Sequence, residues 1–202
     1  MILKRIFDFV FALGGILVLS PVFCVISAAI LLDSKGSLFY RQIRVGRKER
    51  DFILYKFRTM QMEADKAGLL TVGMNDSRIT RVGGFLRRYK LDELPQLINV
   101  LNGTMSIVGP RPEVRKYVKL YDCTQRKVLG LKPGLTDYAS LAYINENELL
   151  ARSLKPEDTY IEEIMPAKLE LSLRYLNERS FFVDLKIVFM TVLKIFAQRK
   201  LE

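Results

Sequence analysis

A run of residues without any charged side chain, from Phe9 to Leu32, constrains this chain more than any other feature. As an α-helix, its 24 residues would extend about 36 Å, at roughly 1.5 Å per residue. The hydrocarbon core of a bilayer is about 30 Å thick, so the run predicts a helix embedded in a membrane. A cleaved signal peptide is disfavoured because the run is too long and no small-x-small cleavage site closes it before Asp33.

Two details argue against a simple membrane span. Ser20-Pro21 lies in the middle of the run, where proline removes a backbone donor and bends the helix, and the Ser20 hydroxyl can satisfy a freed carbonyl. Both flanks are basic, with Lys4 and Arg5 before the run and Lys35, Arg41, Arg44, Arg47, Lys48 and Arg50 after it. The positive-inside rule places both ends in the cytoplasm, which predicts a re-entrant helix over residues 1–34. A kinked span and a buried helix of a soluble protein are the alternatives.

Asp8 follows Lys4 by four residues and Arg5 by three. Both spacings place opposite charges on one helix face. A carboxylate at the membrane edge is costly unless it is paired. The sequence therefore predicts an ion pair here, either an ordinary interfacial pair or an anchor that fixes the depth of the helix.

The charge balance points to a polyanionic partner. The chain has 32 Lys and Arg against 22 Asp and Glu, a net charge of +10, and the whole excess lies after residue 34. Nucleic acid, anionic lipid and a phosphorylated substrate all fit such an excess. A nucleic-acid partner is disfavoured because the chain has no recognised nucleic-acid motif and carries a membrane segment.

The chain has no histidine and only two cysteines, Cys24 and Cys123. This composition excludes a Ser-His-Asp or Cys-His nucleophile and any His-based metal site. It also offers no disulfide framework or zinc spacing, which fits a reduced compartment. Any acid–base chemistry must come from carboxylates, Lys, Tyr or a bound metal.

The rest of the chain predicts an α/β fold that is mostly helical. Residues 39–43 and 52–57 have strand character, and residues 158–178 form a predicted helix. Residues 114–121 are amphipathic and predict a membrane-surface helix. Residues 181–197 are strongly apolar but short for a span, so they are expected in the core or at the interface. We therefore predict a membrane helix over 1–34 and a small cytosolic, membrane-associated domain over 35–202.

Two adjacent carboxylates, Asp92 and Glu93, open a predicted helix. Leu91, Leu94, Ile98 and Leu101 follow helical spacing, Pro95 suits the first turn and Gly103 suits the end. The free backbone amides of a helix N-terminus favour both carboxylates and bound phosphate. Simple capping of the helix by Asp92 is the alternative interpretation.

Arg111 lies between two prolines in the segment from Ile107 to Glu113. The prolines fix the backbone on either side, so the guanidinium is rigidly placed for two-point phosphate binding. The alternative is a structural turn with a surface arginine.

These segments, taken in order and at their spacing, resemble the bacterial sugar transferase family, the monotopic phosphoglycosyl transferases. The resemblance covers nearly the whole chain and is carried by Lys4-Arg5-x-x-Asp8, Ser20-Pro21, Arg41-Gln42 with Gly46, Tyr55-Lys-Phe-Arg-Thr-Met60, Asp76-x-Arg-Ile-Thr80, Leu91-Asp-Glu-Leu-Pro-Gln96, Met105-Ser-Ile-Val-Gly-Pro-Arg-Pro112 and Lys132-Pro-Gly-Leu-Thr136. Departures include Thr104 and Asp137-Tyr138, and Ser172 near a position where the family has aspartate. Asp184 matches a later aspartate of the family.

The resemblance implies a sugar-phosphate transfer at the cytoplasmic face of the bacterial inner membrane. Asp92 would be the nucleophile and Glu93 its partner, both associated with Mg²⁺. A UDP-sugar would lose UMP to form a phosphosugar on the enzyme, and undecaprenyl phosphate would accept it, which predicts ping-pong kinetics. The donor sugar is expected to be an N-acetylated hexose.

The residues also nominate a phosphate site. Arg111 is the expected clamp, and Lys56 and Arg58 alternate along a strand, so both point to one face. Two rival functions stay open: a metal-dependent glycosyl transferase that releases UDP, although the chain lacks an Asp-x-Asp motif, and a non-catalytic basic scaffold on the membrane. The scaffold explains the charge and the apolar helix without requiring Asp92 and Glu93.

Overall fold

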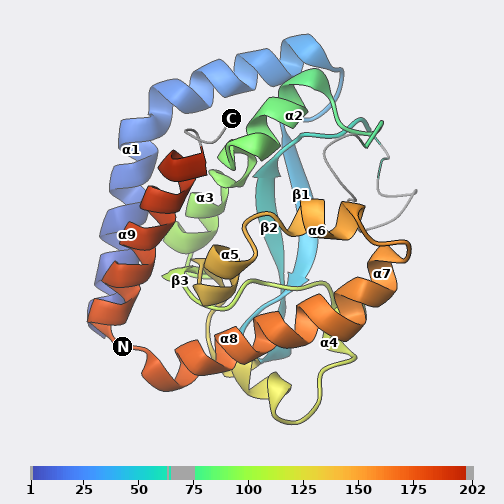
Figure 1. The fold of residues 1–202 in the computed structure, drawn as a ribbon. Coiled ribbons are helices and arrows are strands. Elements are labelled where there is room, and N and C mark those ends of the chain that lie inside the picture. The colour runs from blue at the N-terminus through green and yellow to red at the C-terminus, as the bar shows by residue number, and fades with distance from the viewer. Residues whose placement is uncertain (1, 63, 65–75, 199–202) are drawn as a thin grey trace.

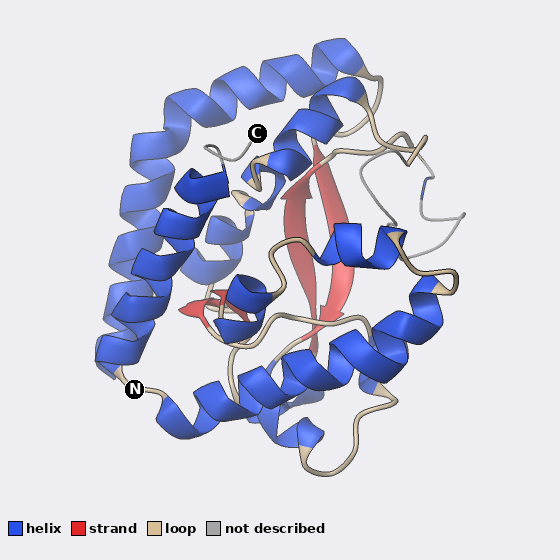
Figure 2. Ribbon diagram, in the orientation of Figure 1, coloured by secondary structure: helices blue, strands red, loops and turns tan. Residues whose placement is uncertain are grey.

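Helices form most of the structure and surround two small sheets (Figure 2). The computed structural model describes residues 2–62, 64 and 76–198. The helices are α1 (Ile2–Asp33), α2 (Arg81–Arg88), α3 (Gln96–Leu101), α4 (Arg115–Val118), α5 (Tyr138–Ala142), α6 (Glu146–Ala151), α7 (Pro156–Thr159), α8 (Met165–Glu178) and α9 (Phe181–Gln198). The strands are β1 (Phe39–Val45), β2 (Asp51–Phe57), β3 (Ser106–Val108) and β4 (Gly134–Thr136). The predicted mostly helical α/β class is confirmed.

The two sheets have two strands each. β1 and β2 form an antiparallel hairpin in which Phe39 pairs with Phe57 and Val45 with Asp51, which confirms both predicted strands. β3 and β4 pair in parallel. Beside them, a side chain at Gly134 would put its Cβ 2.1 Å from the backbone nitrogen of Gly109, so only glycine fits where these two segments meet.

Helix α1 bends sharply and runs along two sides of the molecule (Figure 1). Pro21 lies inside it and cannot donate to the carbonyl of Leu17. The Ser20 hydroxyl donates to that carbonyl at 2.8 Å, as the sequence predicted. Proline is the usual cause of a sharp bend, so Ser20-Pro21 accounts for the shape of α1.

Both halves of α1 pack onto the rest of the chain. Ala12 in the first half lies in a core cluster with Leu97 of α3 and Ile187 of α9. Ile30 in the second half packs in a separate cluster with Phe57 and Leu86. Both ends of α1 are therefore fixed to the same folded unit.

The outer surface of α1 is strongly apolar. Its exposed side chains include Leu3, Val10, Leu17, Val18, Val25 and Leu32, and those of the neighbouring α9 include Phe182, Phe189 and Leu193. The two helices touch where Phe7 and Phe181 stack edge to face at 5.5 Å. Within the described part of the chain, α1 is the one helix long and apolar enough to cross a membrane, judged by length and composition.

Residues 114–121 do not form the predicted membrane-surface helix. α4 covers only part of the segment, and Val114, Tyr117, Val118 and Tyr121 are all buried in a core cluster beneath α8. The apolar side of this amphipathic pattern faces the protein interior instead of lipid. Amphipathic spacing alone cannot distinguish these two environments.

The two C-terminal helix predictions are confirmed. Residues 158–178 are helical from α7 to α8, with a single π-helical segment, Tyr160–Ile164, between them. Residues 181–197 lie in α9, in which Ile187 is fully buried and Phe182 is 80% exposed. α9 thus has one face in the core and one face outside. The division of the chain at residue 34 stays a prediction.

Two adjacent glycines of α2 predict opposite effects on stability. A Cβ at Gly83 would lie 2.0 Å from the carbonyl oxygen of Thr59, whereas a Cβ at Gly84 would meet nothing closer than Ile79 at 3.9 Å. We expect Gly83→Ala to destabilise the fold by about 1–3 kcal/mol through overpacking against backbone. The control Gly84→Ala should be neutral or stabilising by up to about 1 kcal/mol, since alanine favours helix. Thermal unfolding of both variants in the same detergent tests this, and equal midpoints would contradict it.

Candidate active site

The acidic pair lies in a short helical turn that precedes α3. Leu91–Glu93 form a 3-10 turn, Pro95 caps α3, and the helix begins at Gln96. Lys90 enters this turn in the left-handed conformation, with φ of 55°. The helix expected from residue 91 is therefore interrupted, and no side-chain capping bond is made at the start of α3. Asp92 does not cap the helix.

Glu93 is held by two cations. Lys56 Nζ donates to Glu93 Oε1 at 2.8 Å, and Arg111 Nη1 donates to Oε2 at 3.2 Å, with a further contact from Arg111 Nη2 to Oε1. Burial would raise the pKa of Glu93, but Arg111 and Lys56 outweigh it and hold the pKa well below the usual 4.5. Glu93 in turn raises the pKa of Arg111. Glu93 is therefore a permanent anion that positions two cations.

Asp92 differs from its neighbour. Among the described residues, none donates a hydrogen bond to its carboxylate, although the residue is only 6% exposed. Burial raises the pKa of Asp92 above the usual 3.8, while Lys56, Arg87 and Lys90 act to lower it. The expected stabilisation by a helix N-terminus is replaced by a cluster of side-chain cations. Asp92 is thus the carboxylate of the pair with oxygens left to react.

A cavity of about 1010 Å³ opens over this pair. Its charged lining includes Arg41, Arg44, Lys56, Arg58, Arg87, Lys90, Arg111 and Lys168, with Asp92, Glu93, Glu113 and Glu146. Such a volume is at the upper end of the usual range for small-molecule sites, and its cationic surface suits a diphosphate. The sequence predicted Lys56 and Arg111 here.

The sequence reasoning missed Arg87 and Lys90. Burial lowers the pKa of both, and both lie close enough to Asp92 to affect its titration. The available signal was the basic segment Arg87-Arg88-Tyr89-Lys90 immediately before the acidic pair. It is uninformative alone because a basic helix end is common.

Arg58 has a different environment from the one expected. Its guanidinium donates to the carbonyls of Lys35 at 2.8 Å and Ser34 at 2.7 Å, just beyond the end of α1. It also lines the cavity. These contacts tie the end of α1 to the residue that follows β2, and they engage both Nη atoms of the guanidinium that was expected to bind phosphate.

The charged residues at the start of α1 do not pair with one another, contrary to the prediction. Arg5 donates to the carbonyls of Val100 and Leu101 at 2.6 and 2.7 Å, which closes the end of α3. Asp8 is buried and accepts from the Ser106 hydroxyl at 2.8 Å and the Ile107 amide at 3.0 Å. These contacts join α1 to α3 and β3.

Lys4 makes its ion pair with a distant partner. Its Nζ lies 2.5 Å from Asp184 Oδ2, and the Tyr175 hydroxyl donates to Asp184 Oδ1 at 2.6 Å. Asp184 is buried at the start of α9. Sequence spacing pointed to the nearest opposite charge along the helix, whereas the fold supplies Lys4 with a carboxylate from α9 and Asp8 with hydrogen-bond donors from β3.

The acidic pair fits a magnesium ion only in part. The described residues contain no group of three or more His, Cys, Asp or Glu side chains that could hold a metal. Glu93 is engaged by Lys56 and Arg111, which leaves Asp92 to offer a carboxylate. Mg²⁺ commonly binds through one or two carboxylates together with substrate phosphates and water, so a site completed by substrate is compatible with these residues.

Comparison with known proteins matches this arrangement to one family. The family model described as bacterial sugar transferase matches residues 1–198. The chain is 40% identical over 207 residues to the UDP-glucose:undecaprenyl-phosphate glucose-1-phosphate transferase of Escherichia coli (strain K12). The aligned region covers 98% of this chain and 41% of that protein. It is 36% identical over 202 residues to the sugar transferase EpsL of Bacillus subtilis (strain 168), covering 100% of this chain and 91% of EpsL.

A third relative carries a different sugar in its name. The UDP-N-acetylgalactosamine-undecaprenyl-phosphate N-acetylgalactosaminephosphotransferase of Aeromonas hydrophila is 34% identical over 195 residues, covering 94% of this chain and 43% of that protein. The chain therefore spans about two fifths of the two relatives named for a donor sugar and most of EpsL.

Proposed function

Since the chain belongs to the bacterial sugar transferase family, we propose that it transfers a sugar 1-phosphate from a UDP-sugar to undecaprenyl phosphate and releases UMP. The observation that carries this proposal is Asp92, a carboxylate to which no described residue donates a hydrogen bond. It lies in one cavity with the cations Lys56, Arg87, Lys90 and Arg111. A nucleophilic carboxylate can approach a diphosphate only where cations offset the repulsion. A basic membrane scaffold needs no such arrangement.

The proposed reaction has two displacements at one phosphorus atom. An Asp92 oxygen attacks the phosphate that bears the sugar, the bond to UMP breaks, and UMP leaves with the electron pair. An oxygen of undecaprenyl phosphate then attacks the same phosphorus, which releases the Asp92 carboxylate and forms the diphosphate-linked sugar. Splitting the transfer in this way is covalent catalysis.

The cations divide the work in this proposal. Lys56 and Arg111, fixed by Glu93, are placed to bind the oxygens of the diphosphate as charge moves toward UMP. Burial raises the pKa of Asp92, and Lys56, followed by Arg87 and Lys90, acts to lower it. Mg²⁺, held by Asp92 and substrate oxygens, would supply further neutralisation of the phosphate charge. Arg58 is bonded to the carbonyls just beyond the end of α1 and takes no part in this proposed reaction.

We also propose that α1 is re-entrant and lies at the cytoplasmic face of the bacterial inner membrane. The support is that both ends of α1 bond to the same folded unit. Arg5 reaches α3 at one end, and at the other the Asp33 carboxylate accepts from the Val82 amide at 3.0 Å. A straight helix of 32 residues would separate its ends by about 48 Å. The bend in α1 (Figure 1) makes that separation shorter and lets both ends reach this unit.

The first test is nucleotide release. Protein in nanodiscs receives Mg²⁺, undecaprenyl phosphate and a panel of UDP-sugars, and the nucleotide product is identified by chromatography. UMP as the product supports phosphoglycosyl transfer and identifies the donor. UDP as the product would replace this proposal with ordinary glycosyl transfer, and no nucleotide with any donor would favour the scaffold.

The role of the bend has its own test. The background variant carries Cys24→Ser and Cys123→Ser, and a single cysteine then replaces either Ile2 or Ser37. Labelling with a membrane-impermeant thiol reagent in inverted vesicles shows on which side of the membrane that cysteine lies. We expect both sites to be labelled from the cytoplasmic side. Adding Pro21→Ala restores a backbone donor and removes the clash, so part of the population should span the membrane. Labelling of the two parent sites from opposite sides would reject re-entry.

A further inference from the structure

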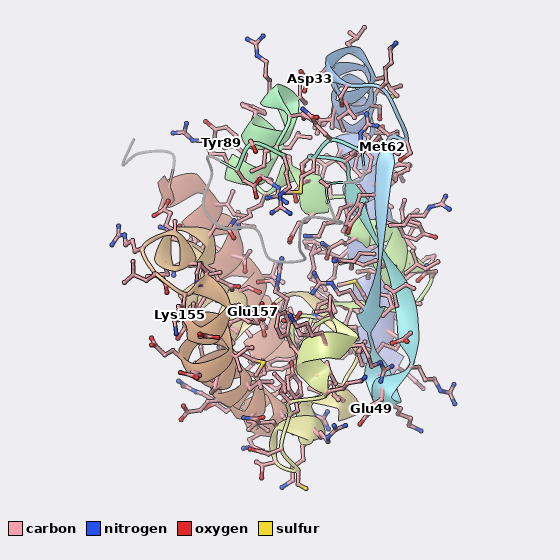
Figure 3. All side chains as sticks on the ribbon, turned by 90° about the vertical axis from the view of Figure 1, so that its right-hand side faces the viewer. Asp33, Glu49, Met62, Tyr89, Lys155 and Glu157 are labelled. Atoms are coloured by element: carbon pink, nitrogen blue, oxygen red, sulfur yellow. The ribbon has the colours of Figure 1, made fainter. Side chains whose placement is uncertain are left out.

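A second charged pair lies on the wall of the same cavity, outside the acidic pair. Lys168 Nζ of α8 donates to Glu146 Oε2 of α6 at 2.7 Å. Their side chains are 13% and 25% exposed, and both line the cavity. Figure 3 shows the adjoining α7 region, with Lys155 and Glu157, on one side of the molecule and Glu49 of the β1–β2 hairpin on the other. Because Glu146 lies in α6 and Lys168 in α8, the pair belongs to the helical wall, whereas Lys56 comes from β2 of the hairpin.

The pair is connected to the reactive end of the cavity. The pKa of Arg111 is raised chiefly by the negative charge of Glu93 and to a smaller extent by that of Glu146. The Glu146 carboxylate is therefore close enough to interact electrostatically with the Arg111 guanidinium. Lys168 Nζ also lies 5.3 Å from the ring centroid of Tyr160, whose hydroxyl donates to Glu113. Glu113 follows Arg111 by two residues, so one short segment contacts both walls.

The chemistry of this wall differs from that of the phosphate end. Glu146 repels a phosphate, and with Lys168 it forms a neutral pair. One oxygen of Glu146 accepts from Lys168, and within the described residues its Oε1 makes no hydrogen bond, while the ammonium carries three N–H donors. The carboxylate can accept from one hydroxyl group while the ammonium donates to another.

We propose that Glu146 and Lys168 bind the hexose of the nucleotide-activated donor and select which hexose is accepted. This inference rests on the proposed function, which requires the sugar to lie next to the phosphate attacked by Asp92. The hexose hydroxyls donate to Glu146 Oε1 and accept from Lys168. A site built to bond a hydroxyl discriminates strongly against a donor that misplaces it, because its buried polar groups are then left unpaired.

The test compares donors that differ only in the hexose. For wild type, Glu146→Gln and Lys168→Met, kcat/KM of UMP release is measured with UDP-glucose, UDP-galactose and their two N-acetylated counterparts. We expect kcat/KM for the preferred donor to fall about 10- to 100-fold, the loss of one or two charged hydrogen bonds. The ratio between preferred donor and its epimer should fall at least about tenfold. A parallel loss with all donors, together with a lowered Tm, would mean that the pair only holds α6 to α8.

Arg174→Gln is the matched control. Arg174 is on the same helix and pairs with Glu178 at 2.8 Å, but both side chains are exposed, at 63% and 41%. Its loss should leave the donor ratio unchanged. A change of equal size would show that any charge lost from α8 alters selectivity and would overturn the inference.

A binding measurement separates this inference from the proposed reaction. Saturation-transfer NMR on Asp92→Asn protein reports hexose and uridine protons of a bound UDP-sugar separately. Glu146→Gln in that background should weaken the hexose signals and retain the uridine signals. The reverse pattern would assign the pair to the nucleoside and overturn the inference alone. No saturation of any of the four donors would overturn the inference and the proposed function together.

Discussion

Asp92→Asn is expected to lower UMP release by at least about 10⁴-fold, the scale of loss seen when a covalent nucleophile is removed. The amide has nearly the same shape as the carboxylate but is a poor nucleophile. Because no described residue donates a hydrogen bond to Asp92, the substitution breaks no such bond and should preserve the fold. Initial rates in nanodiscs with Mg²⁺ and the preferred donor measure the effect. Near-normal turnover would remove Asp92 from the chemistry.

A half-reaction sharpens this prediction. If a phosphosugar forms on Asp92, labelled UMP should exchange into the UDP-sugar without any undecaprenyl phosphate present. Asp92→Asn should abolish that exchange. The control Asp158→Asn changes a carboxylate that is 59% exposed and lies 3.8 Å from Lys155, and it should exchange as wild type does. Turnover by wild type without exchange would favour direct transfer between the two substrates.

The pH dependence follows from the two carboxylates. Burial raises the pKa of Asp92, so kcat/KM should rise with pH along an acid limb whose midpoint lies above 3.8. Glu93 stays ionised through that range because Arg111 and Lys56 hold its pKa well below 4.5. The raised pKa of Asp92 in the folded state also means that its protonation favours folding. That contribution is present below the unfolded pKa and is lost as pH rises through the folded one. An acid limb below 3.8 would contradict the assignment to Asp92.

The sequence predicted the elements of this fold better than their contacts. The hairpin, the helix over 181–197 and the bend with its Ser20 hydroxyl all follow from local rules about strands, helices and proline. The partners of Lys4 and Asp8 do not, since they come from residues about a hundred positions or more away. Local spacing is informative only while the nearest opposite charge is also the nearest in space.

Local sequence patterns also fail to predict which charged groups of the site pair with one another. Asp92, Glu93, Lys56 and Arg111 could be nominated because they lie in recognisable segments, and the fold brings them to one cavity. Glu93 pairs with Arg111, whereas no described residue donates a hydrogen bond to Asp92. This difference depends on the left-handed turn at Lys90, which no composition rule predicts. The burial of Val114, Tyr117, Val118 and Tyr121 could not be predicted for the same reason, because it depends on a core cluster shared with residues of α8.

Arg111→Lys is expected to lower kcat/KM about 10- to 100-fold, although the charge is retained. Arg111 contacts both oxygens of Glu93 with one planar group, and the flanking prolines fix its approach. Lysine offers a single point of contact, so one charged hydrogen bond worth about 1.5–3 kcal/mol is lost and Glu93 is held less firmly. The effect should appear with every donor sugar, unlike that of the Glu146–Lys168 pair.

Arg115→Lys is the control for Arg111→Lys. Arg115 also bonds a carboxylate, Asp51 at 2.6 Å, but that pair is 40% and 49% exposed and lies outside the cavity lining. Arg111 is about as exposed, at 37%, so the two arginines differ chiefly in position. Because Arg115 lies outside the cavity, the rate of Arg115→Lys should match wild type. Unchanged kinetics in Arg111→Lys would show that two-point binding by the guanidinium is dispensable and that the phosphate site depends on Lys56, Arg87 and Lys90 alone. A loss of kcat/KM in Arg111→Lys but not in Arg115→Lys would place the effect in the part of the cavity where Glu93 positions the cations. Glu93 would then act in catalysis by holding Arg111 rather than by transferring a proton.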